Sequence, residues 1–202
     1  MDSESSPIQL IIGLGNPGSA YEQTRHNAGA DFVSYLSQKF DISLRQENKF
    51  LGFAGDGLML GKRVRLLIPT TYMNKSGQSA SAMASFYQIP VEQVLVAHDE
   101  LDIPPGSVRL KVGGGHGGHN GLRDLIQAFG NNKNFRRLRF GIGHPGSAID
   151  VTGYALSKPS KHDHELLEDN FNDVERLLAD ILSGNNAKAM QVLHSQPKPS
   201  IE

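Results

Sequence analysis

Residues 10–29 read LIIGLGNPGSAYEQTRHNAG, a stretch that starts as an apolar strand and breaks at a glycine-rich turn. The turn, residues 13–18 (GLGNPG), satisfies the G-x-G-x-x-G pattern of dinucleotide-binding domains. In those domains the third glycine opens a helix whose N-terminal amides meet a pyrophosphate. Here Pro17 offers no N–H and fixes its own φ, and helical apolar spacing resumes only within residues 32–40. The stretch therefore predicts a strand, a sharp turn and a later helix, and its context argues against a dinucleotide.

Strand-like and helix-like patterns alternate along the rest of the chain. Strands are predicted over 8–13, 50–55, 63–68, 94–98, 108–112 and 137–142, and helices over 26–40, 76–88, 119–129 and 161–183. Turn residues at 56–57 and 61–62 predict antiparallel pairing within 50–68. We therefore expect an α/β fold, with a mixed, twisted β-sheet flanked by helices. Residues 1–195 are expected to form a single domain, and residues 196–202 a flexible tail.

The composition is that of a globular protein. The chain has 202 residues, of which 38% are hydrophobic and 20% charged, and its net charge is −1. The absence of cysteine excludes disulfides and thiolate chemistry. Residues 1–7 lack the basic and apolar blocks of a signal peptide, and no apolar run approaches the roughly 20 residues of a membrane span. A cytoplasmic protein is expected.

The charges are unevenly distributed. Residues 109–139 hold seven basic residues and one acidic residue, whereas residues 163–180 hold seven acidic residues and one arginine. A neutral chain with this asymmetry can carry a local anion-binding face. The alternative is that the basic and acidic segments are two ordinary solvated surfaces. Arg136 and Arg137 are also expected at the surface.

Four polar loops carry the side chains that are able to take part in catalysis or binding. They span residues 16–27, 70–77 (TTYMNKSG), 98–102 (HDELD) and 113–121 (GGGHGGHNG). Loops at the carboxyl ends of strands converge on one crevice in α/β sheets. A histidine oriented there by a carboxylate can act as a general base on water, which is worth about 10²–10⁴-fold in rate.

The histidines have other possible roles. His26 lies at the start of a predicted helix, which it could cap. His98 ends a predicted strand, where it could be packed in the core. His116 and His119 with Asp99 could bind zinc, because imidazole and carboxylate suit that metal. The spacing H-G-G-H lacks the helical geometry of H-E-x-x-H, so no metal site is predicted. Three further histidines are expected at the surface: His162, His164 and His194.

Five sequence blocks, in this order, resemble bacterial-type peptidyl-tRNA hydrolases. They are GLGNPG…Y…TRHNAG, PTTYMNKSG, HDELDIPPG, K-x-GGGHGGHNGLRDL and FRRLRFGIGHPG, and the resemblance extends from Ile8 to Leu193. It implies hydrolysis of the ester that joins a peptide, or an N-blocked aminoacyl group, to tRNA, so that the tRNA is recycled. It further implies a monomeric enzyme without cofactor or metal, with peptidyl-tRNA as its partner and no binding of DNA or membranes.

The resemblance also implies the roles of the reacting residues. His26 matches the general base that activates water, and Asp99 the carboxylate that orients this imidazole and favours its charged form. Asn16 matches the residue that distinguishes blocked from free aminoacyl-tRNA, since a neutral amide and an ammonium make different demands on a fixed amide side chain. Either Asn74 or Asn16 could stabilise the oxyanion.

Further positions match substrate contacts of the family. Residues that match contacts to the peptide or the terminal nucleotide are Tyr21, Tyr72, Asn74 and Asn120, and Met73 and His119 are expected to line the same cleft. The family more often has phenylalanine at position 72, and ordinary core packing is the alternative for Tyr72 and Met73.

Basic residues match the site for the 5′ phosphate of tRNA. Lys111 and Arg139 match the residues that hold this phosphate, with Arg109 as a helper where the family more often has lysine. Arginine keeps the charge but changes the contact geometry. Phosphate contacts position a nucleic acid without reading its sequence, as an enzyme acting on all tRNAs requires.

Two other functional classes remain as alternatives. An RNA-binding module would hold tRNA without cleaving it, but it would leave His26 and Asp99 without a role. A nucleotide-dependent oxidoreductase would instead have to bind NAD at the glycine-rich turn.

Overall fold

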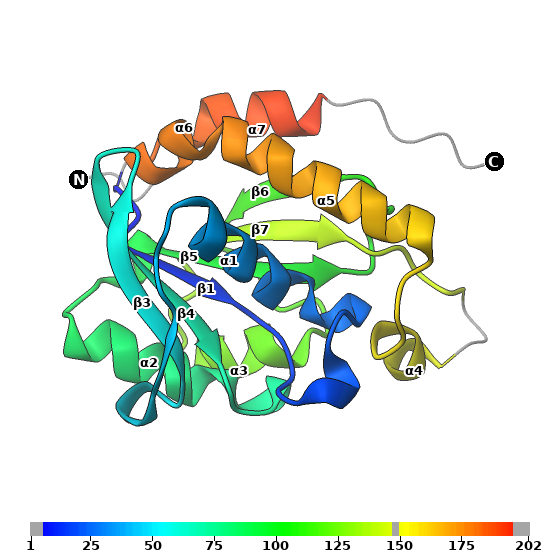
Figure 1. Cartoon of the computed structure of the whole chain (residues 1–202), viewed down its shortest axis with the longest axis horizontal. Helices are drawn as coiled ribbons and strands as arrows, with labels where there is room; N and C mark the ends of the chain where they lie inside the picture. The colour runs from blue at the N-terminus through cyan, green and yellow to red at the C-terminus, as the bar shows by residue number, and fades with distance from the viewer. Residues whose placement is uncertain (1–5, 147–149, 196–202) are drawn as a thin grey trace.

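The computed structural model describes residues 6–146 and 150–195, which form one mixed β-sheet between two layers of helices (Figure 1). Within these residues the strands follow the order β2-β3-β4-β1-β5-β7-β6 across the sheet. Their bounds are β1 (Leu10–Gly13), β2 (Arg45–Glu47), β3 (Gly52–Met59), β4 (Lys62–Pro69), β5 (Val94–Glu100), β6 (Val108–Val112) and β7 (Arg136–Gly141).

The centre of the sheet is parallel and its two edges are antiparallel. β1 runs parallel to β4 and β5, and β5 runs parallel to β7. β3 pairs antiparallel with β4 through a turn at residues 60–61, and β6 pairs antiparallel with β7. All four residues of β1 are buried, as expected of a parallel strand covered on both faces. The predicted mixed sheet is confirmed, and so is the predicted antiparallel pairing within 50–68. The sequence did not predict β2 (RQE), which has no apolar alternation.

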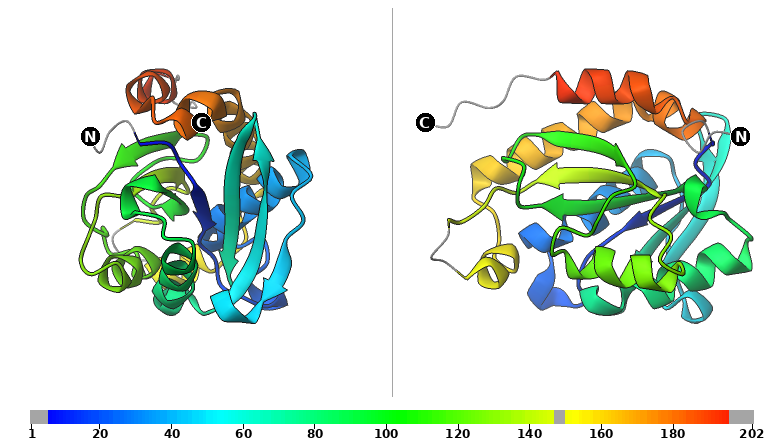
Figure 2. Two further views of the ribbon diagram at one scale, coloured as in Figure 1. Left: turned by 90° about the vertical axis from the view of Figure 1, so that its left-hand side faces the viewer. Right: turned by 180° about the vertical axis from the view of Figure 1, so that it is seen from behind.

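The helices divide between the two faces of the sheet, as Figures 1 and 2 show. One core packs against α1 (Ala28–Lys39), α5 (Lys161–Arg176), α6 (Leu178–Ser183) and α7 (Asn186–His194). The other core packs against α2 (Ser76–Phe86) and α3 (Asn120–Ala128). The short α4 (Val151–Ala155) lies beyond the carboxyl ends of the central strands, and the 3₁₀ turns are η2 (Ser19–Tyr21), η3 (Arg25–Asn27), η4 (Asn48–Phe50), η5 (Met73–Lys75) and η6 (Val91–Gln93).

Several predicted boundaries need correction. The predicted helix 161–183 is two helices, α5 and α6, which meet at Leu177. It does end at Gly184 in the left-handed conformation (φ 82°). The sequence analysis missed α4 and α7. The predicted tail, 196–202, lies outside the described residues. No helix in the parts of the chain that the structure describes is both long and apolar enough to cross a membrane.

Two glycines allow α1 to lie very close to the central strands. An added Cβ at Gly29 would lie 2.0 Å from the carbonyl oxygen of Ala97 in β5, and one at Gly13 would lie 2.3 Å from the carbonyl oxygen of Gly29. The Leu14 amide donates to that same Ala97 oxygen at 3.0 Å. The glycine-rich turn thus places the start of α1, and η3 before it, directly over the end of β5.

We predict that Gly29→Ala destabilises the protein by about 1–3 kcal/mol, because the methyl group has no space against Ala97. Alanine is intrinsically favoured over glycine in a helix by about 1 kcal/mol, so a loss of stability shows that the steric overlap dominates. Urea unfolding measures the effect. The matched control is Gly115→Ala, where an added Cβ meets no atom within 4 Å. A Gly29 variant as stable as wild type would contradict the close-approach argument.

Candidate active site

A cleft of about 650 Å³ opens at the carboxyl ends of the central strands. Each of the four polar loops contributes to its wall, so the predicted convergence of these loops is confirmed. Its lining residues are Asn16, His26, Tyr72, Met73, Asn74, Lys75, Asp99, Glu100, Leu101, Gly117, Gly118, His119, Asn120, Val151, Thr152, Ala155 and Leu156.

Two histidines donate to one carboxylate at the base of the cleft. Nδ1 of His26 lies 2.9 Å from Oδ1 of Asp99, and Nε2 of His119 lies 3.0 Å from the same oxygen. The Asp99 side chain is only 4% exposed, and that of His26 is 15% exposed. The sequence predicted the pairing of His26 with Asp99 but not the second imidazole on the same oxygen.

The hydrogen bonds assign the tautomers of both histidines. Nδ1 of His119 accepts from the Leu122 amide at the start of α3, so its proton lies on Nε2 and is donated to Asp99. His26 uses Nδ1–H for the same carboxylate, which leaves the lone pair on its Nε2 free. Of these two histidines, His26 is therefore the one with a free basic nitrogen, whereas both ring nitrogens of His119 are engaged in hydrogen bonds.

The electrostatics of the site follow from burial and pairing. Burial alone would raise the pKa of Asp99, but the charges and hydrogen bonds of His26 and His119 hold that pKa far below its usual range. Burial lowers the pKa of His26, but the charge and hydrogen bond of Asp99 outweigh it, so the net shift is upward from 6.5. Asp99 thus stays ionised and favours the protonated form of His26.

His98 supports the site from within the core. It is 1% exposed, and its Nδ1 donates to the Asp99 carbonyl oxygen at 2.7 Å. Its ring packs edge-on against that of His119, with centroids 5.1 Å apart. Burial, reinforced by the neighbouring His119, lowers the pKa of His98 to about 3. His98 is a packed, neutral residue, in agreement with the sequence prediction.

Asn16 is held in one orientation by Asn27, a residue that the sequence analysis did not assign to the site. The Asn27 side chain accepts from the backbone N–H of Asn16 at 2.8 Å and donates to the backbone carbonyl oxygen of Asn16 at 3.0 Å. Oδ1 of Asn16 accepts from the Met73 amide at 2.8 Å. Because Oδ1 is engaged, the Nδ2 group of Asn16 is the part of the side chain available as a donor in the cleft.

The other predicted substrate residues differ in placement. Tyr72, Asn74 and Asn120 lie on the cleft wall, and Tyr72 is 60% exposed, which excludes core packing for it. Met73 also lines the cleft but is 4% exposed and packs in the core. Tyr21 lies in η2 and is not among the lining residues.

The histidines and Asp99 fit hydrogen bonding better than metal binding. The structure groups Asp99 and His119 with His26 and not with His116. A metal on Nε2 of His119 would require the proton on Nδ1, where it would oppose the Leu122 N–H. The donor set is therefore that of a hydrogen-bonded group.

The basic residues of β6 and β7 form a cationic face beside the cleft. In the antiparallel register Arg109 stands opposite Arg139, and Lys111 stands opposite Arg137. Like charges placed opposite each other are unfavourable unless an anion or acid compensates them. Arg139 pairs with Glu100 at 3.0 Å, and no ion pair within the described residues neutralises Arg109 or Lys111. This face is suited to bind an anion.

The expectation that Arg136 and Arg137 lie at the surface is wrong. Arg136 is fully buried and bonds to Asn186, and Arg137 is 2% exposed. Arg137 donates to the carbonyl oxygens of Gly114 and Gly115 at 2.5 Å, and so it anchors the glycine-rich loop before His119. Strand alternation directs the two arginines to opposite faces, and polar partners at their guanidinium groups offset part of the cost of burying each one. Among the other histidines, His162 and His194 are exposed as predicted, and His164 is half-buried.

We predict that His26 titrates above 6.5 in NMR spectra of its imidazole nitrogens, because the Asp99 carboxylate stabilises its protonated form. Asp99→Asn removes that charge and leaves the effect of burial, so the His26 pKa is expected to fall. His98, with a pKa of about 3, is expected to stay neutral across the same range and serves as an internal control. An unchanged His26 pKa in the Asp99 variant would contradict the assigned electrostatics.

Comparison with known proteins identifies the family of the chain. The family model described as peptidyl-tRNA hydrolase matches residues 10–200. The peptidyl-tRNA hydrolase of Pseudomonas savastanoi pv. phaseolicola is 56% identical over 189 residues, covering 94% of this chain and 97% of its own length. That of Saccharophagus degradans is 54% identical over 196 residues, covering 97% and 100%.

Solved structures lead to the same family. The Acinetobacter baumannii peptidyl-tRNA hydrolase superposes with a TM-score of 0.90 at 49% identity, covering 96% of this chain and 97% of that one. A peptidyl-tRNA hydrolase crystallised with N-propanol gives a TM-score of 0.91 at 48% identity, covering 98% of each chain. With the sequence, the fold and these relatives in agreement, the chain belongs to the peptidyl-tRNA hydrolase family.

Proposed function

We propose that this peptidyl-tRNA hydrolase activates its hydrolytic water with His26, whose orientation Asp99 sets. The observation that supports this assignment is the 2.9 Å contact from Nδ1 of His26 to Asp99, which leaves Nε2 as the free basic nitrogen. Nε2 takes a proton from water as the water oxygen attacks the ester carbonyl, and Asp99 stabilises the resulting imidazolium. The proton then passes to the ribose oxygen as the ester C–O bond breaks, which releases a peptide carboxylate and free tRNA.

We assign two of the cleft asparagines, Asn16 and Asn74, to different oxygens of the substrate. Nδ2 of Asn16 is a fixed donor, because its Oδ1 is bound to the Met73 amide. A donor suits the carbonyl of an N-blocked amino acid and disfavours the ammonium of a free one. Asn74 is then the donor for the oxyanion that forms when water attacks. The sequence left open whether Asn16 or Asn74 stabilises the oxyanion, and this proposal assigns that role to Asn74.

We assign the remaining substrate contacts by position. Tyr72, Met73, His119 and Asn120 lie around the cleft, where the peptide and the terminal nucleotide of tRNA would be held. Tyr21 is proposed as a contact at the cleft margin.

We also propose that the enzyme acts as a monomer in the cytoplasm. The sequence resemblance implies a monomer, and tRNA recycling belongs with translation. Neither a cofactor nor a metal enters the proposed reaction.

The cationic face is proposed to hold the 5′ phosphate of tRNA. Lys111 is exposed and lies opposite the buried Arg137, and Arg109 faces Arg139 across the strand pair. Because Glu100 already occupies part of the Arg139 guanidinium, we expect Lys111 and Arg109 to provide much of the unpaired positive charge. This contact would position tRNA without reading its sequence.

We predict that His26→Ala lowers kcat for N-acetyl-aminoacyl-tRNA by about 10²–10⁴-fold, because the general base is lost. KM is expected to change little, since the other residues that line the cleft remain in place. The matched control is His162→Ala, which alters an exposed histidine on α5. The wild-type reaction should also persist in EDTA. Wild-type rates in the His26 variant, or complete loss of activity with chelator, would refute the mechanism.

We predict that Lys111→Ala weakens tRNA binding at low salt and reduces the slope of log K against log salt concentration by about 1. The expected cause is the loss of one phosphate contact. Binding is measured with tRNA carrying or lacking its 5′ phosphate. The variant should lose discrimination between the two, whereas Lys161→Ala, an exposed lysine on α5, should retain it. Full discrimination by the Lys111 variant would place the phosphate elsewhere.

A further inference from the structure

Helix α4 forms one wall of the cleft although it is too short to be stable by itself. It contributes Val151, Thr152 and Ala155 to the lining, and Leu156 follows directly after it. The helix is five residues long, and Ala155 is its one buried residue. A helix of this length is not stable alone in water. Its position therefore depends on the contacts that dock it against the rest of the protein.

Arg25, the residue before His26, makes a concentrated set of those contacts. Its Nη1 donates to Oγ of Ser157 at 2.7 Å and to the carbonyl oxygen of Lys158 at 2.8 Å. Its guanidinium carbon lies 4.2 Å from the centroid of the Tyr154 ring. Its backbone amide donates to the Ser157 carbonyl at 3.0 Å. One residue of the catalytic turn thus contacts both the body of α4 and the segment that leaves it.

The surroundings of Arg25 make this contact specific for arginine. The guanidinium lies at the C-terminal end of α4, where backbone carbonyls lack intrahelical partners and accept from basic side chains. It also approaches Asp163 at the start of α5 to 3.7 Å, and its side chain is only 12% exposed. A planar guanidinium can stack on a ring and donate to several acceptors at once, which an ammonium cannot do.

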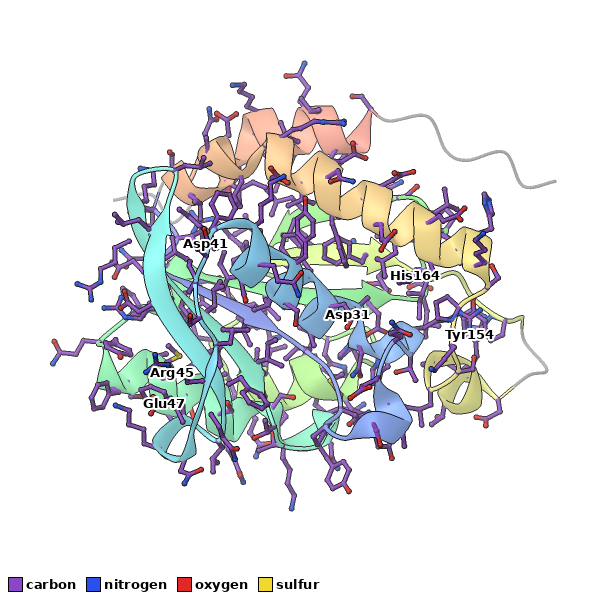
Figure 3. All side chains as sticks on the ribbon, viewed as in Figure 1. Asp31, Asp41, Arg45, Glu47, Tyr154 and His164 are labelled. Carbon is purple, nitrogen blue, oxygen red and sulfur yellow. The ribbon has the colours of Figure 1, made fainter. Side chains whose placement is uncertain are left out.

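Tyr154 contributes to the same contact from the α4 side. Its hydroxyl donates to the carbonyl oxygen of Ile142 at 2.6 Å, just after β7. Figure 3 shows Tyr154 at the end of the molecule where α4 approaches α5, near His164. The tyrosine therefore attaches α4 to the sheet through its hydroxyl, while its ring supports Arg25.

We propose that Arg25 is a positioning residue that docks α4 against the turn carrying His26. Arg25 and His26 are consecutive in η3, so the contacts of Arg25 hold the α4 wall at a fixed place relative to the reacting nitrogen. This inference rests on the proposed use of the cleft as the substrate site. When the dock is weakened, α4 occupies its binding-competent position for a smaller fraction of the time, and the apparent affinity falls by that fraction.

The test compares KM and kcat for N-acetyl-aminoacyl-tRNA in the full chain. If docking falls to about one tenth, Arg25→Ala raises KM roughly tenfold while kcat stays within about threefold. Arg25→Lys should recover only part of the loss. Tyr154→Leu removes the ring contact with Arg25 and the hydrogen bond to Ile142 without altering the catalytic turn, so it should raise KM in the same way. The matched control is Arg176→Ala, an exposed, ion-paired arginine on α5, which should leave both constants unchanged.

Two further measurements separate docking from a direct effect on the base. The pH midpoint of kcat/KM should be unchanged in Arg25→Ala, because Asp99 still sets the protonation of His26. Amide hydrogen exchange over residues 150–157 should accelerate in both variants. If Arg25→Ala does not fold, Tyr154→Leu is used for the same measurements.

The contrary outcomes are distinct. Loss of kcat at constant KM, or a shifted pH midpoint, would show that Arg25 acts on His26 itself and would overturn the proposal. Wild-type KM together with unchanged exchange in a folded variant would also overturn it. If His26→Ala remained active while Arg25→Ala raised KM, the mechanism would fail and the docking role would stand.

Discussion

The buried carboxylate of Asp99 is the group to which the rest of the site is fitted. An ionised carboxylate at 4% exposure is costly unless charged or polar donors satisfy it, and here two imidazoles donate to a single oxygen. Each donor constrains a different element. His119 ties α3 to the end of β5, because its second nitrogen accepts the Leu122 amide. His26 ties the turn before α1 to the same point. One carboxylate thus aligns both helical layers with the end of the sheet and, of the two imidazoles that donate to it, leaves Nε2 of His26 free to react.

The sequence predicted the parts of this arrangement that follow from local pattern. Strands β1, β4 and β5 are apolar runs ended by polar loops, and loops at carboxyl strand ends meet in one crevice, so grouping Asn16, His26, Asn74 and Asp99 needed no coordinates. The pairing of His26 with Asp99 came from the family resemblance, because residues separated by 73 positions show no spacing signal. The second donor to Asp99 was beyond prediction for a physical reason. Which of His116 and His119 reaches the carboxylate depends on how the loop before α3 lies over the end of β5, and that is a tertiary fact.

The residues that the sequence analysis missed act through contacts distant in sequence or through burial. Asn27 holds both backbone groups of Asn16, but asparagine at a helix start is equally typical of a cap. Arg136 and Arg137 looked like surface charge because burial of arginine depends on partners elsewhere, here Asn186 and the carbonyls of Gly114 and Gly115. Helix α4 is too short to show periodicity. A pattern of residue types indicates which groups can react, whereas the groups that hold them in place become visible only when the chain is folded.

The glycine-rich turn shows how one pattern can serve two chemistries. In a dinucleotide fold the glycines let a phosphate approach the backbone. Here Gly13 and Gly29 let α1 approach β1 and β5, and their missing side chains are replaced by protein atoms at 2.0–2.3 Å from the Cβ positions. The helix does not begin at Gly18 but ten residues later at Ala28, and the intervening residues place His26 in the cleft and Arg25 beside it. The close approach that could have admitted a cofactor instead brings a histidine to a carboxylate. The motif therefore specifies how near two backbones come, and the residues between them specify the chemistry.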